Sequence, residues 1–471
     1  MKMLIGGREV GVRETIDVTN PYDGSVIDAV PAASAAEIED ALETAERGAA
    51  AMAGLTRSER AGILRGVSAE LLRRRDELAP LLASETGKTV REARGELARA
   101  SETFSVAAGE ALRLAGEIVP FDAAPTGGDR FGFFLRVPLG IVVAITPFNF
   151  PVNLAAHKIA PAIAAGNAVV LKPASATPLC DLALGRMLYA AGLPPEALSV
   201  VTGSGRDVGD ALVGDPRPRM VTFTGSRDVG RAILSRAGIK KTAMELGSNS
   251  ALIVTRHCDV EAAAERAALA SFALAGQVCI SLQRVLVDET VRERFAERIV
   301  SAARSLNVGN QLLEETDVGP MIDEAESERA ARWLEEAVDA GAAVLCGGGR
   351  DGTRFEPTVV SDPPEDARVW ADEVFAPIVS IRGFAELDEG IAAVNASRYG
   401  LQAGVYTDRL EEALEAAHRI RCGGVMINDV PTFRVDLMPY GGEKESGLGR
   451  EGPRFAVEEM SEIRVVGVRR A

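Results

Sequence analysis

The chain has 471 residues, more than one hydrophobic core usually supports, so two or more domains are expected. Its 47% hydrophobic and 25% charged residues are typical of a globular protein and leave no segment that composition marks as disordered. The formal net charge of -16 argues against binding to nucleic acid or to an anionic membrane, because both need a basic protein surface.

Cysteine usage and the lack of targeting patterns indicate a reducing compartment. Five cysteines, odd in number and without CxxC spacing, form neither a disulfide framework nor a recognisable metal site. Arg8 and Glu9 precede any apolar stretch of signal-peptide length, and no apolar run reaches the roughly 18 residues of a membrane span. We therefore expect a cytoplasmic protein with no metal, membrane or nucleic-acid partner.

The N-terminal third is expected to be largely helical. Ser34-Ala-Ala-Glu37 and Thr56-Arg-Ser-Glu59 each precede a stretch rich in Ala, Leu and Arg. Both have the form of a capping box, in which a hydroxyl and a carboxylate satisfy the free amides of the first helical turn. Helices are therefore predicted to begin directly after Ser34 and Thr56.

From Gly140 the pattern changes to alternating strands and helices. Short β-rich runs such as GIVVAIT, NAVVLK, RMVTFT and KTAMEL alternate with segments of helical periodicity at 153–165, 177–191 and 226–237. Such alternation predicts right-handed βαβ crossovers and a parallel sheet.

A second alternating region begins near Ser250. Helices are predicted over about 259–275 and 290–304, and later strands over 403–406 and 424–427. This region is interpreted as a second α/β domain.

Two segments fit neither domain. Residues 117–137 have the composition of strands inserted between the helical start and the first sheet, and residues 462–468 resemble a single strand that needs a partner. Together they are predicted to form an arm that pairs with another subunit.

Three strand-to-helix junctions of the first region carry residues suited to a nucleotide: TPFNFP from Thr146, LKPASATP with Lys172, and FTGSRDVG with Gly225 and Ser226. Free amides of helix N-termini at the carboxyl ends of parallel strands bind phosphates. Each turn alone is explained by a need for glycine, but three at one sheet edge favour a nucleotide. The segment GSGRDVG, ending at Gly209, is one residue too long for the usual dinucleotide fingerprint.

Three residues are candidates for catalysis. Cys279, in the sequence GQVC, follows a predicted helix in a loop where a thiol can be exposed and reactive. Glu245 ends a strand in an apolar context, where burial would raise its pKa toward that of a general base, although it could also be a capping or ion-paired residue. Asn149 could donate its amide to a developing oxyanion, or could serve only as a turn residue before Phe150-Pro151.

The remaining cysteines and the histidines are interpreted as structural. Buried positions are expected for Cys180, Cys258, Cys346 and Cys422. The three histidines, at 157, 257 and 418, show no spacing of metal ligands, so a cysteine protease with a histidine partner is disfavoured.

The blocks TPFNFP, KPASATP, FTGS, MELGS, GQVC, DEVFAP and PYGGEKESGLGREG resemble the aldehyde dehydrogenase superfamily in order and approximate spacing. The resemblance runs along essentially the whole chain. It implies an α/β fold of two Rossmann-like doubly wound domains with a small β oligomerisation arm, assembled as a homodimer or homotetramer. The implied division is a cofactor-binding domain at 1–116 and 138–247, a catalytic domain at 248–438, and the arm at 117–137 and 439–471.

The resemblance also implies roles for individual residues. Cys279 matches the nucleophile, Glu245 the base that activates water, and Asn149 the oxyanion amide, assisted by the backbone amide of Cys279. Matches to the cofactor site are Lys172 and Glu373 for the riboses, Ser226 for the pyrophosphate, and Phe375 beside the nicotinamide; Thr146, Gly209 and Gly225 are expected to line the same site.

The expected reaction is oxidation of an aldehyde through a thiohemiacetal and a thioester, with NADP or NAD as hydride acceptor. Glu245 favours a free acid as product, because members that transfer the acyl group to CoA often lack it. An acyl-CoA or acyl-phosphate reductase is the alternative enzyme, and a non-catalytic binding protein the alternative outside enzymes. Ser175 replaces a glutamate that many NAD-preferring relatives carry, so NADP is expected to be accepted, and a preference for NADP over NAD is left open.

The substrate is left open between anionic and neutral aldehydes. Arg99 and Arg434 match positions where relatives acting on phosphorylated or phosphono aldehydes carry arginines, and arginine suits phosphate and carboxylate. Either arginine could instead make a structural contact, and Val278 beside the nucleophile supplies no cation. Candidates are glyceraldehyde phosphate, succinic semialdehyde and lactaldehyde.

Overall fold

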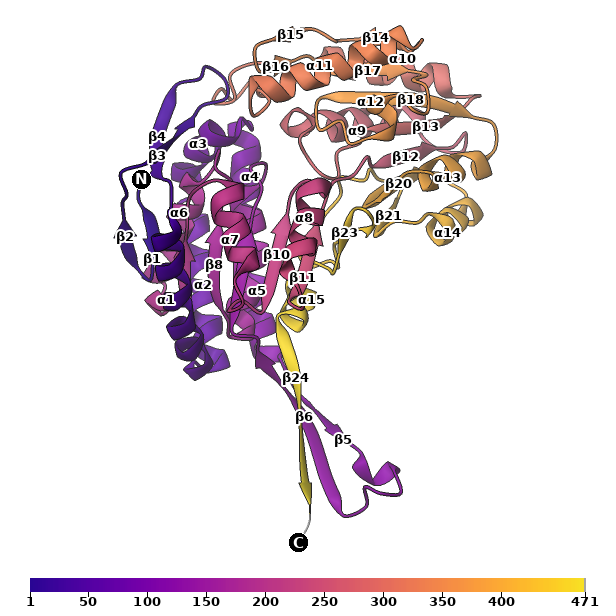
Figure 1. Ribbon diagram of the computed structural model, residues 1–471. Coiled ribbons are helices and arrows are strands. Elements are labelled where there is room, and N and C mark those ends of the chain that lie inside the picture. The colour runs from indigo at the N-terminus through magenta and orange to yellow at the C-terminus, as the bar shows by residue number, and fades with distance from the viewer. Residues whose placement is uncertain (470–471) are drawn as a thin grey trace.

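The computed structural model describes residues 1–469. Two α/β bodies lie side by side, and a narrow arm projects from the body that contains the N-terminal half of the chain (Figure 1). This arrangement confirms the predicted α/β fold with two doubly wound sheets.

Within the described residues the first sheet has eight strands in the order β2-β1-β9-β8-β7-β10-β11-β23. The five central strands, β9 to β11 in this order, are parallel, and antiparallel strands close both edges. Their bounds are β1 Met3–Ile5, β2 Arg8–Val10, β7 Ile141–Ile145, β8 Ala168–Lys172, β9 Leu198–Val200, β10 Met220–Thr224, β11 Lys241–Glu245 and β23 Gly447–Leu448.

Helices cover both faces of this sheet and give it two separate cores. One face carries α5, which is buried along its whole length because α2 and α4 pack over it. The helices are α1 Ala35–Gly54, α2 Arg57–Arg73, α3 Arg75–Thr86, α4 Val90–Arg113, α5 Pro151–Ala165, α6 Leu179–Ala190, α7 Asp210–Gly214 and α8 Arg227–Ala237. The capping boxes predicted at Ser34 and Thr56 are both formed.

The second sheet has seven strands in the described residues, in the order β14-β17-β18-β13-β12-β20-β21, and all neighbours except β14 and β17 are parallel. The strands are β12 Ala251–Val254, β13 Arg284–Asp288, β14 Ala343–Cys346, β17 Thr358–Ser361, β18 Ile378–Phe384, β20 Gln402–Tyr406 and β21 Gly424–Ile427. The helices on its two faces are α9 Val260–Phe272, α10 Arg292–Arg304, α11 Glu324–Asp339, α12 Arg368–Ala371, α13 Leu387–Asn395 and α14 Leu410–Arg419.

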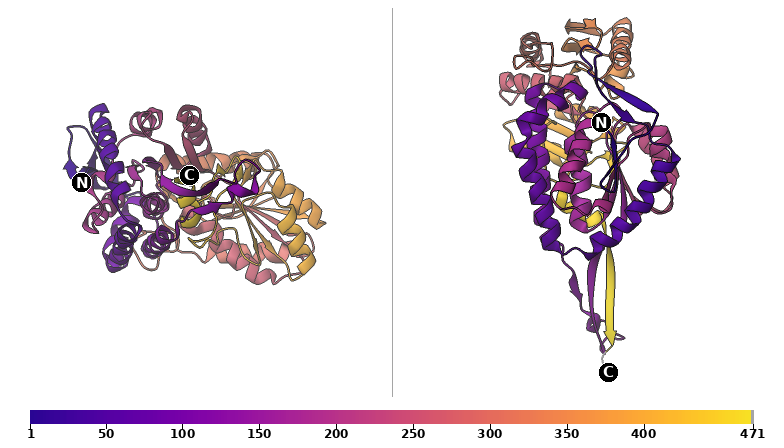
Figure 2. Two further views of the ribbon diagram at one scale, coloured as in Figure 1. Left: turned by 90° about the horizontal axis from the view of Figure 1, so that it is seen from below. Right: turned by 90° about the vertical axis from the view of Figure 1, so that its left-hand side faces the viewer.

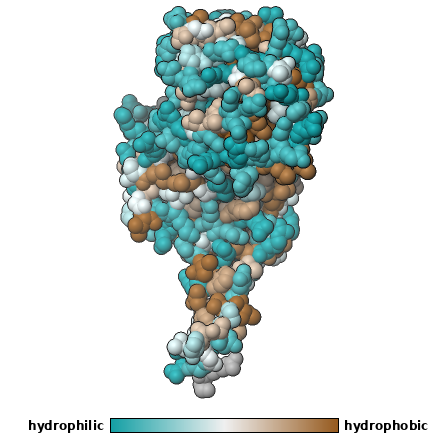
Figure 3. Space-filling view, turned by 90° about the vertical axis from the view of Figure 1, so that its right-hand side faces the viewer, coloured by the Kyte–Doolittle hydropathy of each residue, from teal (hydrophilic) through white to brown (hydrophobic). Residues whose placement is uncertain are grey.

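The arm is an antiparallel sheet of β5 (Glu117–Val119), β6 (Arg130–Pro138) and β24 (Ser461–Arg469). It projects away from both bodies in Figure 1 and in the right-hand view of Figure 2. Apolar side chains gather along it in the space-filling view (Figure 3), and the exposed ones are Ile118, Phe131, Leu135, Ile463, Val465 and Val468. An exposed apolar surface of this kind marks an interaction site.

The structure differs from the sequence predictions at both ends of the chain. Residues 3–31, expected within a largely helical region, form four strands, of which two extend the first sheet and β3 (Thr15–Thr19) and β4 (Val26–Pro31) pair as a hairpin. The C-terminal segment was assigned to the arm from residue 439, but it joins the arm only at β24. Before that, β22 (Glu443–Lys444) pairs with β19 (Tyr399–Gly400), and β23 pairs with β11.

A short hairpin of β15 (Arg350–Asp351) and β16 (Arg354–Phe355), and α15 (Pro453–Glu459) at the base of the arm, complete the fold. No helix in residues 1–469 is both long and apolar enough to cross a membrane. The same part of the chain contains no cluster of side chains suited to a metal ion.

Candidate active site

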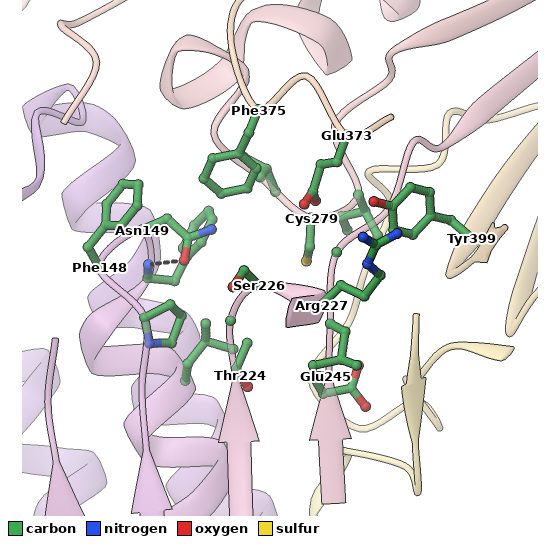
Figure 4. Close-up of a pocket in the computed structure, with 18 of the residues that line it drawn as sticks. Phe148, Asn149, Thr224, Ser226, Arg227, Glu245, Cys279, Glu373, Phe375 and Tyr399 are labelled. Atoms are coloured by element: carbon green, nitrogen blue, oxygen red, sulfur yellow. Dashed lines mark hydrogen bonds between the residues drawn. The ribbon is translucent and has the colours of Figure 1, made fainter. Parts of the chain in front are cut away.

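A cavity of about 830 Å³ lies between the two sheets and contains most of the predicted site residues. The carboxyl ends of β10 and β11 and the loop after β7 form one wall, and the loops around Cys279 and Glu373 form the other (Figure 4). Parallel strands end at a common edge, so their loops meet there. The site residues in this cavity are Asn149, Gly225, Ser226, Glu245, Cys279, Glu373, Phe375, Arg99 and Arg434.

The loop that carries Cys279 is shaped by an unusual run of backbone conformations. After α9, Leu274 and Ala275 have φ values of 48° and 50°, and Gly276 has φ 72°. A Cβ at Gly276 would lie 2.1 Å from the carbonyl oxygen of Ala376, so only glycine fits there. This turn ends the helix abruptly and brings the thiol into the cavity.

The Cys279 sulfur contacts the hydroxyl of Tyr440 at 3.0 Å. Burial raises the pKa of the thiol to about 11, while the Tyr440 hydrogen bond and the charge of Arg434 act in the opposite direction. Since the thiolate is the reactive form of a cysteine, a nucleophilic role for Cys279 would require activation within the site.

Asn149 is held from three sides. Its Nδ2 donates to the carbonyl oxygen of Gln277 at 2.9 Å, and its Oδ1 accepts from the amide of Phe150 at 3.1 Å. Its backbone carbonyl accepts from Nζ of Lys88 at 2.7 Å. One hydrogen of the Nδ2 group remains for an acceptor in the cavity, because an amide has two. Gln277 is two residues from Cys279, so this bond links the amide to the loop that carries Cys279.

Glu245 ends β11 and is 5% exposed, and its Oε2 has no hydrogen-bond partner in the described residues. Burial raises its pKa well above the usual range, and Glu451 raises it further, whereas Arg434 and Lys158 lower it. The surroundings are therefore charged and not apolar as the sequence predicted. The raised pKa itself agrees with the prediction and suits a group that exchanges protons near neutral pH.

A group of charged side chains lies next to Glu245 and Cys279. It consists of Arg99, His157, Arg434, Asp436 and Glu451, and we call it the Arg434 cluster. Nη2 of Arg434 donates to Glu451 at 3.0 Å and lies 3.0 Å from Nε2 of His157. The buried Nε of Arg434 has no partner in the part of the chain that is described. The guanidinium thus retains donor capacity.

Asp436 accepts several hydrogen bonds in this cluster. Arg99 contacts it through Nη2 at 2.8 Å and Nε at 3.1 Å, and His157 through Nε2 at 2.9 Å. Burial would raise the pKa of Asp436, but the hydrogen bonds from His157 and Arg99 outweigh it and hold the pKa well below its usual range. Burial and the charge of Arg434 lower the pKa of His157. Both predicted substrate arginines therefore line the cavity while also making ion pairs.

The cofactor candidates in the cavity lie where the first sheet meets the loop of Glu373. Ser226 caps α8 by accepting from the amide of Val229 at 3.4 Å. A Cβ at Gly247 would lie 2.2 Å from Oε2 of Glu373, so this glycine allows the carboxylate to approach. Burial raises the pKa of Glu373 to about 7. Phe375, with φ 49°, faces Phe148 edge-on at 6.0 Å between ring centres.

Four predicted cofactor residues lie outside this cavity, which does not include Thr146, Lys172, Ser175 or Gly209. Lys172 ends β8 and Thr146 follows the adjacent strand β7, and the Thr146 amide donates to the Lys172 carbonyl at 3.2 Å. Ser175 donates its hydroxyl to the Gly203 carbonyl at 2.8 Å. Burial lowers the pKa of Lys172 to about 8.

These residues fit a dinucleotide laid along the sheet edge. Among residues 1–469, no carboxylate forms an ion pair with the 4% exposed Lys172, so an ammonium is available there for a ribose or phosphate. The N-terminal amides of α8 follow Ser226 at the same edge. Gly209 ends a π-helical turn, Gly205–Gly209, whose N-cap is Ser204.

A model of the aldehyde dehydrogenase family matches residues 9–466. The chain belongs to the aldehyde dehydrogenase family. It is 44% identical to a 3-sulfolactaldehyde dehydrogenase of Priestia megaterium, over 98% of this chain and 97% of that protein. The crystal structure of aldehyde dehydrogenase 21 from Physcomitrella patens, in complex with the reaction product succinate, matches with a TM-score of 0.97 and 40% identity, covering 100% and 98% of the two chains.

A second solved structure is glyceraldehyde-3-phosphate dehydrogenase GapN from Methanocaldococcus jannaschii, complexed with NADP. It matches with a TM-score of 0.93 and 40% identity, covering 97% of this chain and 100% of that one. This aldehyde dehydrogenase is accordingly an NAD(P)-dependent oxidoreductase, as the sequence predicted.

Sequence reasoning missed several residues of the site. Tyr440 and Glu451 stand in the sequence only as members of the family block PYGGEKESGLGREG, and no motif marks Lys88 or Asp436. The only signal for Tyr440 was its place before two glycines in PYGG, and Lys88 gave none, because lysine is rarely buried. Of the other cysteines, Cys258 and Cys422 are only partly buried, contrary to expectation.

Proposed function

We propose that this enzyme oxidises a small aldehyde that carries a second, anionic group, and releases the free acid. The observation that carries the proposal is the charge of the cavity wall beside Cys279. Arg99 and Arg434 line the cavity, and with the buried Lys158 next to them they face only two ionised carboxylates in their ion pairs, Asp436 and Glu451. The wall therefore has a cation in excess.

Two neighbouring titratable groups, Glu245 and His157, bear on that excess. Burial raises the pKa of Glu245 and lowers the pKa of His157, so burial disfavours the charged form of each. The Arg434 Nε is buried without a partner, and an unpaired buried donor is costly unless a ligand uses it. A carboxylate, sulfonate or phosphate on the substrate would supply the acceptor.

The relatives are consistent with this substrate class. The names of the Priestia enzyme and of GapN specify aldehydes with a sulfonate and a phosphate, and the moss enzyme holds succinate, a dicarboxylate. These three anions differ in shape but share the negative charge that Arg99 and Arg434 would meet.

The reacting groups have defined tasks in this proposal. The Cys279 sulfur attacks the carbonyl carbon, and the free hydrogen of Asn149 Nδ2 stabilises the negative oxygen that forms. Loss of such a donor typically costs about 3 kcal/mol of transition-state stabilisation. A nicotinamide cofactor, when bound, would supply the hydride acceptor, and Gly225, Ser226 and Glu373, which line the cavity, would hold the dinucleotide. Glu245 then takes a proton from the water that cleaves the thioester.

We further propose that NADP is used at least as well as NAD. Ser175 removes a carboxylate that would repel a ribose phosphate, and the Lys172 ammonium is free of ion pairs with described carboxylates. A ratio of kcat/KM values that favours NAD about tenfold or more would contradict this part of the proposal.

The apolar surface of the arm supports a homodimer or homotetramer, and the five free cysteines fit a reducing cytoplasm. Light scattering on the eluted peak of a sizing column gives the subunit number, and a monomer would contradict this assembly.

The substrate class is tested with Arg99→Met. Succinic semialdehyde and butanal have the same chain length and differ in the carboxylate. We expect kcat/KM to fall about tenfold or more for succinic semialdehyde, as for loss of a charge-assisted hydrogen bond, and to stay nearly constant for butanal. Glyceraldehyde phosphate and lactaldehyde extend the comparison to a phosphate and to a neutral hydroxyaldehyde.

The matched control is Arg186→Met, since Arg186 pairs with Glu9 on the edge of the first sheet and does not line the cavity. It should leave both rates unchanged. If Arg99→Met lowers kcat/KM equally for succinic semialdehyde and butanal, Arg99 has a structural role only. That result would contradict the proposal of an anionic substrate.

The free acid product is tested with Glu245→Gln. We expect a burst of reduced cofactor of about one equivalent per site, followed by very slow turnover, because the thioester forms but water is no longer activated. Stopped-flow absorbance at 340 nm measures the burst. Wild-type turnover that requires added CoA or phosphate would instead support the acyl reductase alternative.

A further inference from the structure

Tyr440 holds a fixed position against the nucleophile from a segment far away in the sequence. Its side chain is 2% exposed, and its backbone exchanges two hydrogen bonds with Glu451, at 3.1 and 2.6 Å. The hydroxyl lies 3.0 Å from the Cys279 sulfur. The guanidinium of Arg434 lies 3.7 Å from the ring centroid. The ring is thus fixed between a cation and a thiol.

We propose that Tyr440 is a positioning residue for the nucleophile: its hydroxyl donates a hydrogen bond to the Cys279 sulfur and stabilises the thiolate that attacks the aldehyde. The phenol keeps its own proton throughout. This role belongs to the oxidation of any aldehyde and is independent of the anionic substrate proposed above.

The donor direction follows from the surroundings of the two groups. Burial raises the pKa of Tyr440, and the neighbouring Cys279 raises it further, so the phenol remains protonated over the working range. The Arg434 cation on the ring face draws electron density from the phenol and makes its O–H a stronger donor. The thiolate accepts and cannot donate, so the bond has a single sense once the sulfur is ionised.

The sulfur needs such a donor because other features of its site oppose ionisation. Burial is the largest of them, and the carboxyl groups of Glu245 and Glu373 act in the same direction. Arg434 favours the thiolate, but through space and not by a contact with the sulfur. In the described chain no histidine lines the cavity. Within residues 1–469, the side chain that hydrogen-bonds to the Cys279 sulfur is that of Tyr440.

The test is the reaction of Cys279 with iodoacetamide in Tyr440→Phe, measured from pH 6 to pH 10. Mass spectrometry of the Cys279 peptide separates this site from the other four cysteines. We expect alkylation at pH 8 to slow about tenfold and the pH profile to shift upward by about one pH unit, as for loss of a hydrogen bond to a charged group. The matched control is Tyr189→Phe, because the Tyr189 hydroxyl donates a hydrogen bond to the Leu198 carbonyl and does not line the cavity.

A second substitution covers the case in which Tyr440→Phe perturbs the fold. Site-specific replacement of Tyr440 by 3-fluorotyrosine keeps the ring and makes the phenol more acidic, so alkylation at pH 8 should become faster. A wild-type pH profile in Tyr440→Phe, or slower alkylation with 3-fluorotyrosine, would overturn the proposal. Iodoacetamide is neutral and needs no anion site, so these results do not depend on Arg99.

Discussion

Two groups of buried charges flank the active site, and they differ in how completely their partners satisfy them. Lys88 and Glu96 form an ion pair whose side chains are both 0% exposed. Lys88 also donates to the Asn149 carbonyl and lies 4.1 Å from the centre of the Phe150 ring, and Glu96 accepts from the amide of Asn153. Each charged end of this pair therefore has protein partners.

The hydrogen-bonding groups of the Arg434 cluster are not all satisfied by protein partners. Its two arginines, Arg99 and Arg434, line the cavity. Together with Lys158 the cluster has a cation in excess in its ion pairs, and the Arg434 Nε has no partner in the described residues. The comparison shows that burial of a charge does not by itself indicate function. A charge whose hydrogen bonds are complete supports a loop, here that of Asn149, whereas a charge with spare donors facing a cavity is suited to a ligand.

The largest effect is expected from Lys88→Met. Removing one partner of a buried ion pair leaves the other charge uncompensated, which typically costs about 3–5 kcal/mol of the free energy of unfolding. The loss of the Asn149 contact should also lower kcat equally for succinic semialdehyde and butanal. Urea denaturation followed by circular dichroism measures the stability.

Two further variants make this prediction sharp. The double variant Lys88→Met with Glu96→Leu removes both charges and should recover part of the lost stability. Arg99→Met should cost less than about 1 kcal/mol, because the Arg99 side chain is 33% exposed and Asp436 keeps its bond from His157. Equal losses from Lys88→Met and Arg99→Met would break the distinction between the two groups of charges.

Much of the fold could be predicted because its signals are local. Alternation of apolar strands and periodic helices identified both sheets, and capping boxes fixed the starts of two helices. Residues 3–31 and 439–460 were misplaced because their strands are short and pair with segments distant in the sequence. Short edge strands lack the alternation that reveals a longer strand.

The site residues likewise divide into those that a local sequence signal marks and those that depend on contacts between distant segments. Motifs and strand ends mark Cys279, Glu245 and Asn149, which the structure brings together in one cavity. Tyr440 reaches the nucleophile only through the path of residues 439–460, which the sequence did not reveal. The pairing of Lys88 with Glu96 needs two neighbouring helices to pack, and neither residue type indicates burial.

A smaller effect is expected from Asp436→Asn, which removes a negative charge from the Arg434 cluster and keeps the shape of the side chain. Arg99 and Arg434 should then attract anions more strongly, and inhibition by sulfate should tighten about three- to tenfold, a change of about 1 kcal/mol. Steady-state inhibition with butanal as substrate gives the inhibition constant. An unchanged or weaker constant would show that Asp436 orients the arginines and that its charge does not limit anion binding.

The smallest effect concerns His157, whose pKa is lowered in the folded protein by burial and by Arg434. A group with a lowered folded pKa adds stability above its unfolded pKa of about 6.5, and this stability is lost as the pH falls through that value toward the folded pKa. His157→Gln stays neutral and lacks this dependence. The stability advantage of the wild-type protein over the variant should therefore shrink between pH 7 and pH 5.5, by at most about 1.4 kcal/mol per pH unit.

The difference between the two proteins is the quantity to measure for His157. Glu85 and Glu373, whose pKa values burial raises to about 7, titrate across the same range with the opposite sign in both proteins and cancel from the difference. Urea denaturation at each pH supplies both curves. A constant difference from pH 7 to pH 5.5 would mean that His157 is protonated as easily in the folded protein as in the unfolded chain. The excess of positive charge in the Arg434 cluster would then be larger in acid, and sulfate inhibition should strengthen as the pH falls.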